Sequence, residues 1–219
     1  MKHPRLLAIS ALCLMVLAVR TREAGPEDLP VQSFELICDG ESVTVREGET
    51  VTVKCSADPT RTHSLQVRRK TEQDYATDAL AFRYHSSFSL RDDHDTENRT
   101  LTLIIAEGVS IVITDFGDGT EAEIDGLLAT FAGRLKQNWT ANHGKLISET
   151  QAAKVKFGRS KGKLAVFHYQ DPDGDQHFAR VHVLAAGGRV FSCTVQCTPE
   201  QDEAATRLAE PTLRSIGAK

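Results

Sequence analysis

Residues 163–197, KLAVFHYQDPDGDQHFARVHVLAAGGRVFSCTVQC, decide the fold of this 219-residue chain. Apolar and β-branched residues recur there in three runs, and the short segments between the runs are rich in aspartate, proline and glycine. This pattern predicts three antiparallel strands joined as a meander. The predicted strands cover residues 163–170, 176–185 and 189–197.

Both faces of this predicted sheet are largely apolar. We expect one face to carry Val166, Ala179, Val181 and Val183, and the other to carry Phe167, Tyr169, Phe178 and Leu184. A sheet that is apolar on both sides has to be covered on both sides.

Two segments have the apolar periodicity of amphipathic helices and can provide that cover. In the first, Thr120 and Glu123 form a capping box, and an apolar stripe follows as far as residue 137. In the second, Thr198 is the cap, Pro199 takes the first helical position, and Pro211 predicts a kink or a restart. The predicted fold class is therefore α+β, an antiparallel sheet flanked by helices on both faces, or α/β/α sandwich.

A second hairpin precedes the first helix. LTLII (101–105) and VSIVIT (109–114) are strong strand patterns around a short turn, and residues 115–120, DFGDGT, are expected to form a loop. Between the first helix and residue 163 the chain is rich in asparagine, glycine and lysine, which predicts a loop.

This order of elements resembles the PsbP-like fold. The resemblance rests on LTLII and VSIVIT, the helix TEAEIDGLLATFAGRLKQN, the strand GRVFSCTVQC and the final helix TPEQDEAATRLAEPTLRSI, and it spans roughly residues 80–217. The family includes the photosystem II extrinsic subunit, the Ran-binding Mog-type proteins and exported bacterial proteins of unknown role. It implies an antiparallel sheet flanked by helices, without catalytic residues to carry over.

The N-terminus has the order of a secretory signal peptide. Lys2 and Arg5 precede the apolar run 6–19, and small residues near Ala18 offer a cleavage site. The run is shorter than a bilayer core requires, so we expect cleavage rather than a retained anchor, and no integral membrane span afterwards. The expected organisation is signal peptide 1–18, linker 19–32, N-terminal β-hairpin extension 33–74 and PsbP-like domain 75–219, in a secreted or periplasmic protein.

Four of the five cysteines lie outside the predicted signal peptide, and two of these four suggest a disulfide in the extension. Between Cys38 and Cys55 lies ESVTVREGETVTV, two alternating runs around Gly48 that predict a hairpin and would bring the two cysteines together. Cys193 and Cys197 lie on one face of a predicted strand, too far apart for a bridge, and are expected to be small buried hydrophobes.

The charge balance excludes some partners. The chain has 26 basic and 30 acidic residues, a net charge of −4 and a pI near 6.1, whereas nucleic-acid binders carry an excess of cations. We therefore expect an unknown protein or small-molecule partner and no nucleic acid.

Candidate chemistry is sparse. His168 and His177 flank the 171–175 turn on neighbouring predicted strands, where we expect them to share one face, which makes them candidates for a divalent metal site that lacks an identified third ligand. No nucleophile, metalloprotease or phosphate-binding motif is present. The sequence thus predicts a non-enzymatic exported binding or accessory module without cofactor. The alternatives are a metal-binding protein or metal-dependent enzyme centred on the two histidines, and an interaction module whose N-terminal hairpin pairs with a partner.

Overall fold

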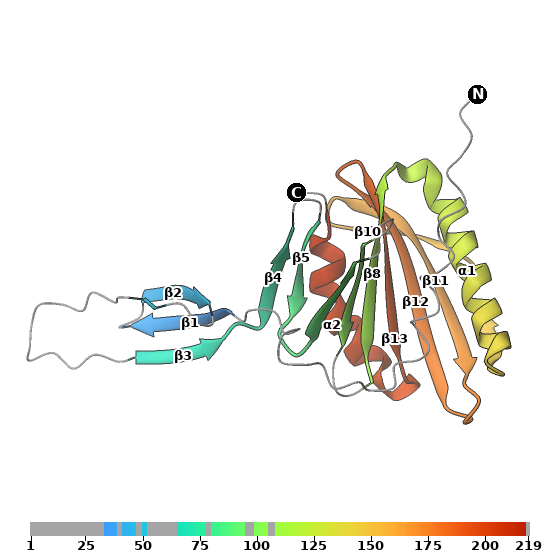
Figure 1. Cartoon of the computed structure of the whole chain (residues 1–219), viewed down its shortest axis with the longest axis horizontal. Coiled ribbons are helices and arrows are strands. Elements are labelled where there is room, and N and C mark those ends of the chain that lie inside the picture. The colour runs from blue at the N-terminus through green and yellow to red at the C-terminus, as the bar shows by residue number, and fades with distance from the viewer. Residues whose placement is uncertain are drawn as a thin grey trace, which may run out of the picture.

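The computed structural model describes residues 33–38, 41–46, 50–51, 65–77, 80–94, 99–104 and 108–217 (Figure 1). These residues form an α+β structure with antiparallel sheets and two helices, as the sequence predicted. The predicted signal peptide and linker, residues 1–32, lie outside the described residues.

The main sheet has eight strands in the order β10-β11-β12-β13-β8-β7-β6, and β9 also pairs with β11. All the pairings within this sheet are antiparallel, and the predicted meander and hairpin are both present. The strands are β6 (Ser89–His94), β7 (Arg99–Ile104), β8 (Ser110–Asp118), β9 (Lys145–Glu149), β10 (Ala153–Phe157), β11 (Ser160–Gln170), β12 (Gln176–Ala186) and β13 (Arg189–Cys197).

The register of β11 and β12 corrects the predicted faces. Gln170 lies opposite Gln176, so Phe167 is paired with Ala179, and both belong to the same buried cluster. Val166 lies opposite Arg180 on the other face. The predicted assignment was wrong because a shift of one residue in register moves a strand's side chains to the opposite face.

Helix α1 (Ile124–Ala141) begins at the predicted capping box and continues four residues beyond the predicted end. The Thr120 backbone N–H donates to Glu123 Oε2 at 2.7 Å, which anchors the short 3-10 turn η2 (Glu121–Glu123) in front of the helix. The extra turn buries Trp139, whose ring stacks on Tyr169 at 4.3 Å. The helix packs onto β11 and β12, and its buried residues run from Ile124 to Trp139.

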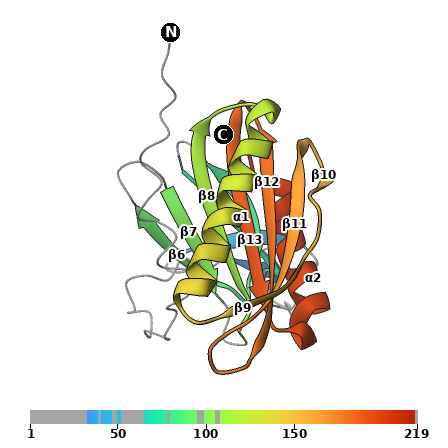
Figure 2. The same ribbon diagram turned by 90° about the vertical axis from the view of Figure 1, so that its right-hand side faces the viewer.

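Helix α2 (Asp202–Ser215) follows the 3-10 turn η3 (Pro199–Gln201) and packs in a different cluster, with β13, β10 and β5. At Pro211 a kink or a restart was expected, and the helix continues through that residue without a restart. Figure 2 shows α1 in front of the sheet and α2 behind it. In β12, Val183 belongs to the buried cluster that includes the apolar residues of α1, and Leu184 belongs to the cluster that includes those of α2. Neighbouring side chains along a strand point to opposite faces of the sheet, so the two clusters lie on opposite faces.

Three segments expected to be loops are strands. β8 continues to Asp118 because its end pairs with Arg189 of β13, and β9 and β10 occupy the free edge of β11. Most side chains of β9 and β10 are exposed, and β9 lacks the alternation that a half-buried strand shows. In β10, Ala153, Val155 and Phe157 do alternate with lysines, so the loop expected there was wrong although the strand pattern was present.

A two-stranded sheet, β4 (Glu72–Ala76) with β5 (Ala81–His85), joins the core beside α2. The Arg83 backbone N–H donates to Ser215 Oγ at 2.7 Å, and residue Gly217 bridges to Ala81. The boundary expected after residue 74 therefore falls inside β4.

The described residues of the N-terminal extension form a three-stranded sheet, and the hairpin expected around Gly48 falls largely outside the described residues. Strand β1 (Ser33–Cys38) is central, between β2 (Glu41–Arg46) and β3 (Leu65–Arg69), and Figure 1 shows this sheet standing apart from the main body. β2 pairs with β1, whereas Thr50 and Val51, expected in its partner strand, are outside any strand. Cys55 lies outside the described residues, so the Cys38–Cys55 bridge stays a prediction.

Candidate binding site

The two histidines singled out in the sequence lie on opposite faces of the sheet. His168 is paired with Phe178, and His177 is paired with Tyr169, so the shared face that the sequence predicted is wrong. His168 Nε2 lies 3.0 Å from Gln176 Oε1, and His177 Nε2 lies 3.1 Å from Asp171 Oδ2. In the described part of the chain no three His, Cys, Asp or Glu side chains are grouped as metal ligands would be.

The 171–175 turn uses its carboxylate internally. Asp171 Oδ1 accepts hydrogen bonds from the backbone N–H groups of Asp173 and Asp175, at 3.0 and 2.9 Å. Desolvation acts to raise the pKa of Asp171, but the hydrogen bonds from His177 and from these two amides outweigh it and lower that pKa. Asp171 thus stabilises a tight connection between β11 and β12.

Two buried groups that could form a nucleophile and a base lie opposite one another beneath α2. Cys193 of β13 is paired with His182 of β12, and both are almost fully buried. Burial raises the pKa of the Cys193 thiol to about 12, and burial together with the Arg180 charge lowers the pKa of His182 to about 4. Both side chains are therefore neutral near pH 7, which is the reverse of the thiolate and imidazolium needed for nucleophilic attack.

Cys193 and Cys197 are expected to resist alkylation in the folded protein. Desolvation holds their thiols protonated, with pKa values raised to about 12 and about 11, and little of either side chain is accessible. Iodoacetamide treatment followed by peptide mass spectrometry should leave both cysteines unmodified at neutral pH and modify both in urea. Alkylation of either residue at equal rates in the two conditions would contradict the packing of β13 against α2.

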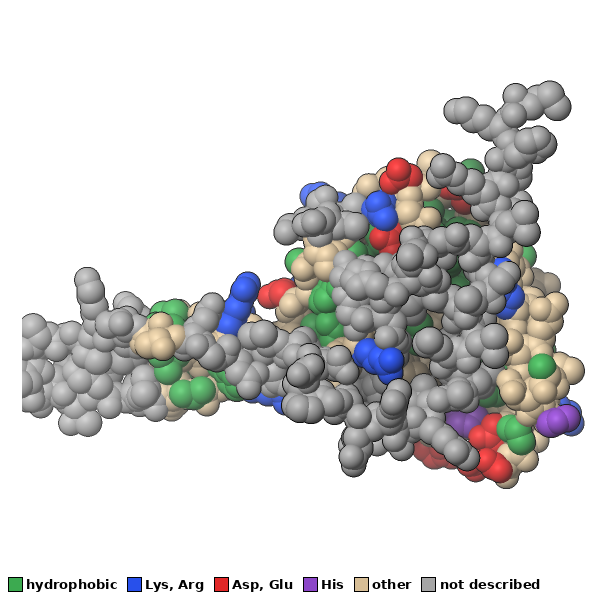
Figure 3. Space-filling view, in the orientation of Figure 1, with side chains coloured by type: hydrophobic (Ala, Val, Ile, Leu, Met, Phe, Trp, Pro, Cys, Tyr) green, Lys and Arg blue, Asp and Glu red, His purple; other side chains and the backbone are tan. Residues whose placement is uncertain are grey.

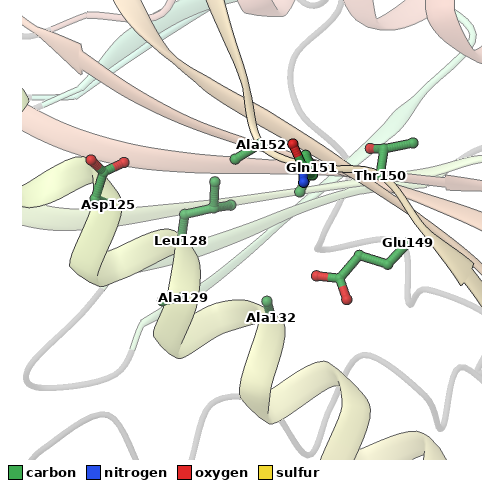
Figure 4. Close-up of a pocket in the computed structure, with 9 residues that line it drawn as sticks. Asp125, Leu128, Ala129, Ala132, Glu149, Thr150, Gln151 and Ala152 are labelled. Carbon is green, nitrogen blue, oxygen red and sulfur yellow. The ribbon is translucent and has the colours of Figure 1, made fainter.

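A hollow of about 330 Å³ lies between α1 and the segment that joins β9 to β10. Figure 4 shows Asp125, Leu128, Ala129 and Ala132 of α1 on one side, facing the segment that begins at Glu149. Its two carboxylates are already engaged, because Asp125 is paired with Lys163 and Glu149 with Lys136. The hollow has room for a small molecule but presents no uncompensated charge that would select one.

The N-terminal sheet exposes an apolar surface. Phe34 and Leu36 of β1 lie beside Val45 and Val43 of β2, and Val67 of β3 extends the same face. We call these five residues the apolar row. Val43 is 46% exposed and Val67 is 66% exposed, and no member of the row belongs to either buried core cluster.

Charged side chains line a hollow of about 410 Å³ where this sheet meets β4 and β5. We call it the junction hollow; its charged residues are Glu35, Arg68, Arg69, Lys70, Glu72, Asp74 and Arg83. Arg68 is paired with Glu35 at 3.1 Å and Arg83 with Glu72 at 3.0 Å. Figure 3 shows hydrophobic side chains on the surface of the N-terminal sheet and basic side chains toward the main body.

Buried polar contacts hold the N-terminal sheet to the body. Gln73 of β4 is only 3% exposed, and its Oε1 accepts from the Ser33 backbone N–H at 2.7 Å. Its Nε2 donates to the Ser33 and Lys70 carbonyls, each at 3.2 Å. One glutamine side chain therefore joins the first residue of β1 to the segment after β3.

Sequence reasoning identified the alternation in β2 but did not identify the exposed row. The signal was present in QVRRK (66–70), where a single valine stands among polar and basic residues. Exposure of that valine depends on the position of β3 at the edge of a sheet, which the sequence pattern does not specify.

No protein-family model matches the chain, and no curated protein matches it in sequence. The most similar solved structures include a 1.50 Å crystal structure of a protein from Bacteroides thetaiotaomicron VPI-5482, with a TM-score of 0.47 and 12% identity. That match covers 68% of this chain and 49% of the other, so the chain spans about half the length of the Bacteroides protein.

The solution structure of cyanobacterial PsbP (CyanoP) from Synechocystis sp. PCC 6803 is also similar, with a TM-score of 0.41 and 12% identity. The match covers 68% of this chain and 93% of that protein. A PsbP structure is therefore one of the solved structures that are similar to this chain. The likeness concerns the fold alone. In the described part of this chain, no helix combines the length and apolar character needed to cross a bilayer.

Proposed function

We propose that this chain is a non-enzymatic accessory protein that acts outside the cytoplasm by binding another protein through its N-terminal sheet. The observation that supports this most directly is the apolar row. A large exposed apolar surface on a protein is a common mark of an interaction site. Here Val43 and Val67 are about half or more exposed, on a sheet that belongs to neither buried cluster.

Energetics favour a covered state of this sheet. Burying apolar surface contributes about 25 cal/mol per Å², so covering a valine side chain contributes on the order of 1 to 2 kcal/mol. A small isolated sheet also gains stability when one of its faces is packed. A partner that covers the apolar row therefore stabilises the N-terminal sheet as well as the complex.

Several further properties belong to the same proposal. The signal-peptide pattern at the N-terminus supports export, to the periplasm or the medium. The separate clusters under α1 and α2 support an α/β/α sandwich as the rigid support for the extension. The neutral state of Cys193 and His182 argues against nucleophilic catalysis by this pair. The proposal includes no cofactor.

Co-purification from the exported fraction of the native host tests the proposal. The unmodified protein should retain a companion protein in constant ratio, and a Val43→Ser, Val67→Ser double variant should lose it because the apolar row becomes polar. Ile147→Ser is the matched control, because Ile147 is an apolar side chain on β9 of the main sheet that is 43% exposed, close to the exposure of Val43. Equal recovery of the companion with both variants, or no companion with the unmodified protein, would reject the proposal.

A further inference from the structure

We propose that the partner adds a strand to the free edge of β3, and that the added segment is an extended peptide in which aliphatic residues alternate with acidic ones. This inference rests on the proposed function and names the kind of partner. It follows from the backbone of β3, from the side chains on its two faces, and from the charge of the junction hollow.

Within the described residues, β3 is paired along one edge only, the edge that faces β1. The Lys70 backbone N–H donates to the Ser33 carbonyl at 3.3 Å, which makes this a hydrogen-bonded pair of the β1–β3 ladder. Hydrogen-bonded and non-hydrogen-bonded pairs alternate in an antiparallel ladder, so the amides of Val67 and Arg69 point away from β1. Among the described strands, none pairs with that edge. An open edge of this kind accepts an additional strand through main-chain hydrogen bonds.

The side chains of β3 specify a two-sided partner. Val67 continues the apolar row, so a residue beside it on the added strand gains most by being aliphatic. Arg68 points to the opposite face, where Glu35 is its cross-strand neighbour and where its side chain remains 68% exposed. A carboxylate on the added strand would flank Arg68 from its open side. Alternating residues point to opposite faces of a strand, so these preferences require alternation in the peptide.

The charge of the junction hollow favours an acidic partner. It contains four basic side chains, Arg68, Arg69, Lys70 and Arg83, against three carboxylates. The hollow is therefore net positive, on a chain whose net charge is −4. A local positive site on an acidic protein attracts an acidic segment and orients it during encounter.

A second copy of this chain fits the surface less well. Three strands of six residues or fewer give a face of about 14 by 20 Å, which is roughly 300 Å². A stable dimer buries about 800 Å² on each partner. Pairing of β3 with its own copy would also place Arg68 and Arg69 near identical charges, which is unfavourable.

The probe is a short fluorescent peptide that alternates valine and glutamate, titrated with the full chain and followed by anisotropy. We expect saturable binding that weakens as salt is added, because the basic side chains are at the surface. A peptide that alternates valine and lysine should bind at least about tenfold more weakly. Equal binding of the two peptides, or binding of neither, would overturn the inference.

Two variants separate the backbone contribution from the side-chain contribution. Val67→Pro removes an outward N–H while leaving the ladder to β1 intact, and proline is tolerated on an edge strand. Val67→Ala keeps that N–H and is the control. We expect the Val67→Pro protein to bind the valine–glutamate peptide about tenfold more weakly than the Val67→Ala protein does.

Hydrogen exchange gives a readout that does not depend on the variants. The amides of Val67 and Arg69 should exchange quickly in the free protein and slowly with the valine–glutamate peptide bound. Slow exchange in the free monomer would mean that the chain covers its own edge, and slow exchange that appears with self-association would mean that a second copy does. Either result overturns the inference. If a companion co-purifies equally with Val67→Pro and Val67→Ala, the binding function stands and strand addition is rejected.

Discussion

Substitution of Gly162 by alanine is expected to destabilise the protein by about 3 kcal/mol or more, or to prevent it from folding. Gly162 lies in β11 opposite Leu184 of β12. A Cβ atom at this position would overlap the backbone carbonyl oxygen of Val183 and would lie 2.9 Å from Leu184 Cδ2. The first of these atoms belongs to a paired backbone, so the clash cannot be relieved by a side-chain rotation and must displace β11 from β12.

Urea unfolding followed by circular dichroism measures this effect. The matched control is Gly126→Ala on the exposed side of α1, where the added Cβ would meet no atom within 4 Å. Alanine is favoured over glycine in a helix, so this control should stabilise the protein by up to about 1 kcal/mol. Equal, small effects of the two substitutions would show that the β11–β12 contact is looser than the structure has it.

Most of the main sheet could be predicted from local sequence. The meander was predictable because each strand carries a run of apolar residues bounded by glycine or aspartate turns. The helix α1 was predictable because Ile124, Leu128 and Leu135 recur on one stripe, and all three are buried. The end of α1 was set too early, because the burial of Trp139 depends on its contact with Tyr169, far along the chain.

The errors concern features fixed by pairing between distant segments. β9 is an exposed strand with little apolar alternation, so it resembled a loop. β10, AKVKF, does alternate, but it is only five residues long and its place beside β11 depends on pairing with a distant segment. The faces of β11 and β12 depend on the register across the 171–175 turn, where one residue of shift reverses every assignment. The same error in register led to the prediction that His168 and His177 share one face. In the observed register they lie on opposite faces, so they do not form the candidate metal pair.

The candidate binding site was only partly accessible from the sequence. The alternation in ESVTVR (41–46) predicted a strand, but its choice of β1 as partner depends on Phe34 and Leu36 facing Val45 and Val43. The segment 33–38 contains few residues, and its pattern alone did not identify it as the central strand. The open edge of β3 is a property of the sheet as a whole.

Stability is expected to fall as the pH decreases from 6.5 to 4, because of one buried histidine. His182 of β12 is 4% exposed, and the ring of Phe157 lies against it at 5.5 Å. Desolvation, and then the charge of Arg180, lower its pKa from 6.5 to about 4. Its Nδ1 has no hydrogen-bond partner among the described residues, so nothing there stabilises a proton on that nitrogen.

The sign follows from proton binding in the two states. Below pH 6.5 the unfolded chain protonates this histidine while the folded chain does not, so unfolding becomes more favourable as the pH falls toward 4. Because the pKa of His182 is 6.5 in the unfolded chain and about 4 in the folded chain, the free energy of unfolding should fall by roughly 3 kcal/mol across that range. Below about pH 4 His182 is protonated in both the folded and the unfolded chain, so its contribution to the free energy of unfolding no longer changes with pH. That contribution is fully present above pH 6.5 and is lost as the pH falls to 4.

Urea unfolding at a series of pH values, compared between variants, isolates the effect from that of the carboxylates. His182→Leu should remove most of the loss between pH 6.5 and 4, because leucine suits the apolar space beside Phe157 and cannot be protonated. His168→Gln is the control, since His168 lies in β11 between β9 and β12, next to Gln176, and the substitution leaves His182 in place, so the fall in stability between pH 6.5 and 4 should remain. The same pH dependence in His182→Leu as in the control would mean that burial beside Phe157 does not lower the pKa of His182, and the packing around this side chain would then have to be revised.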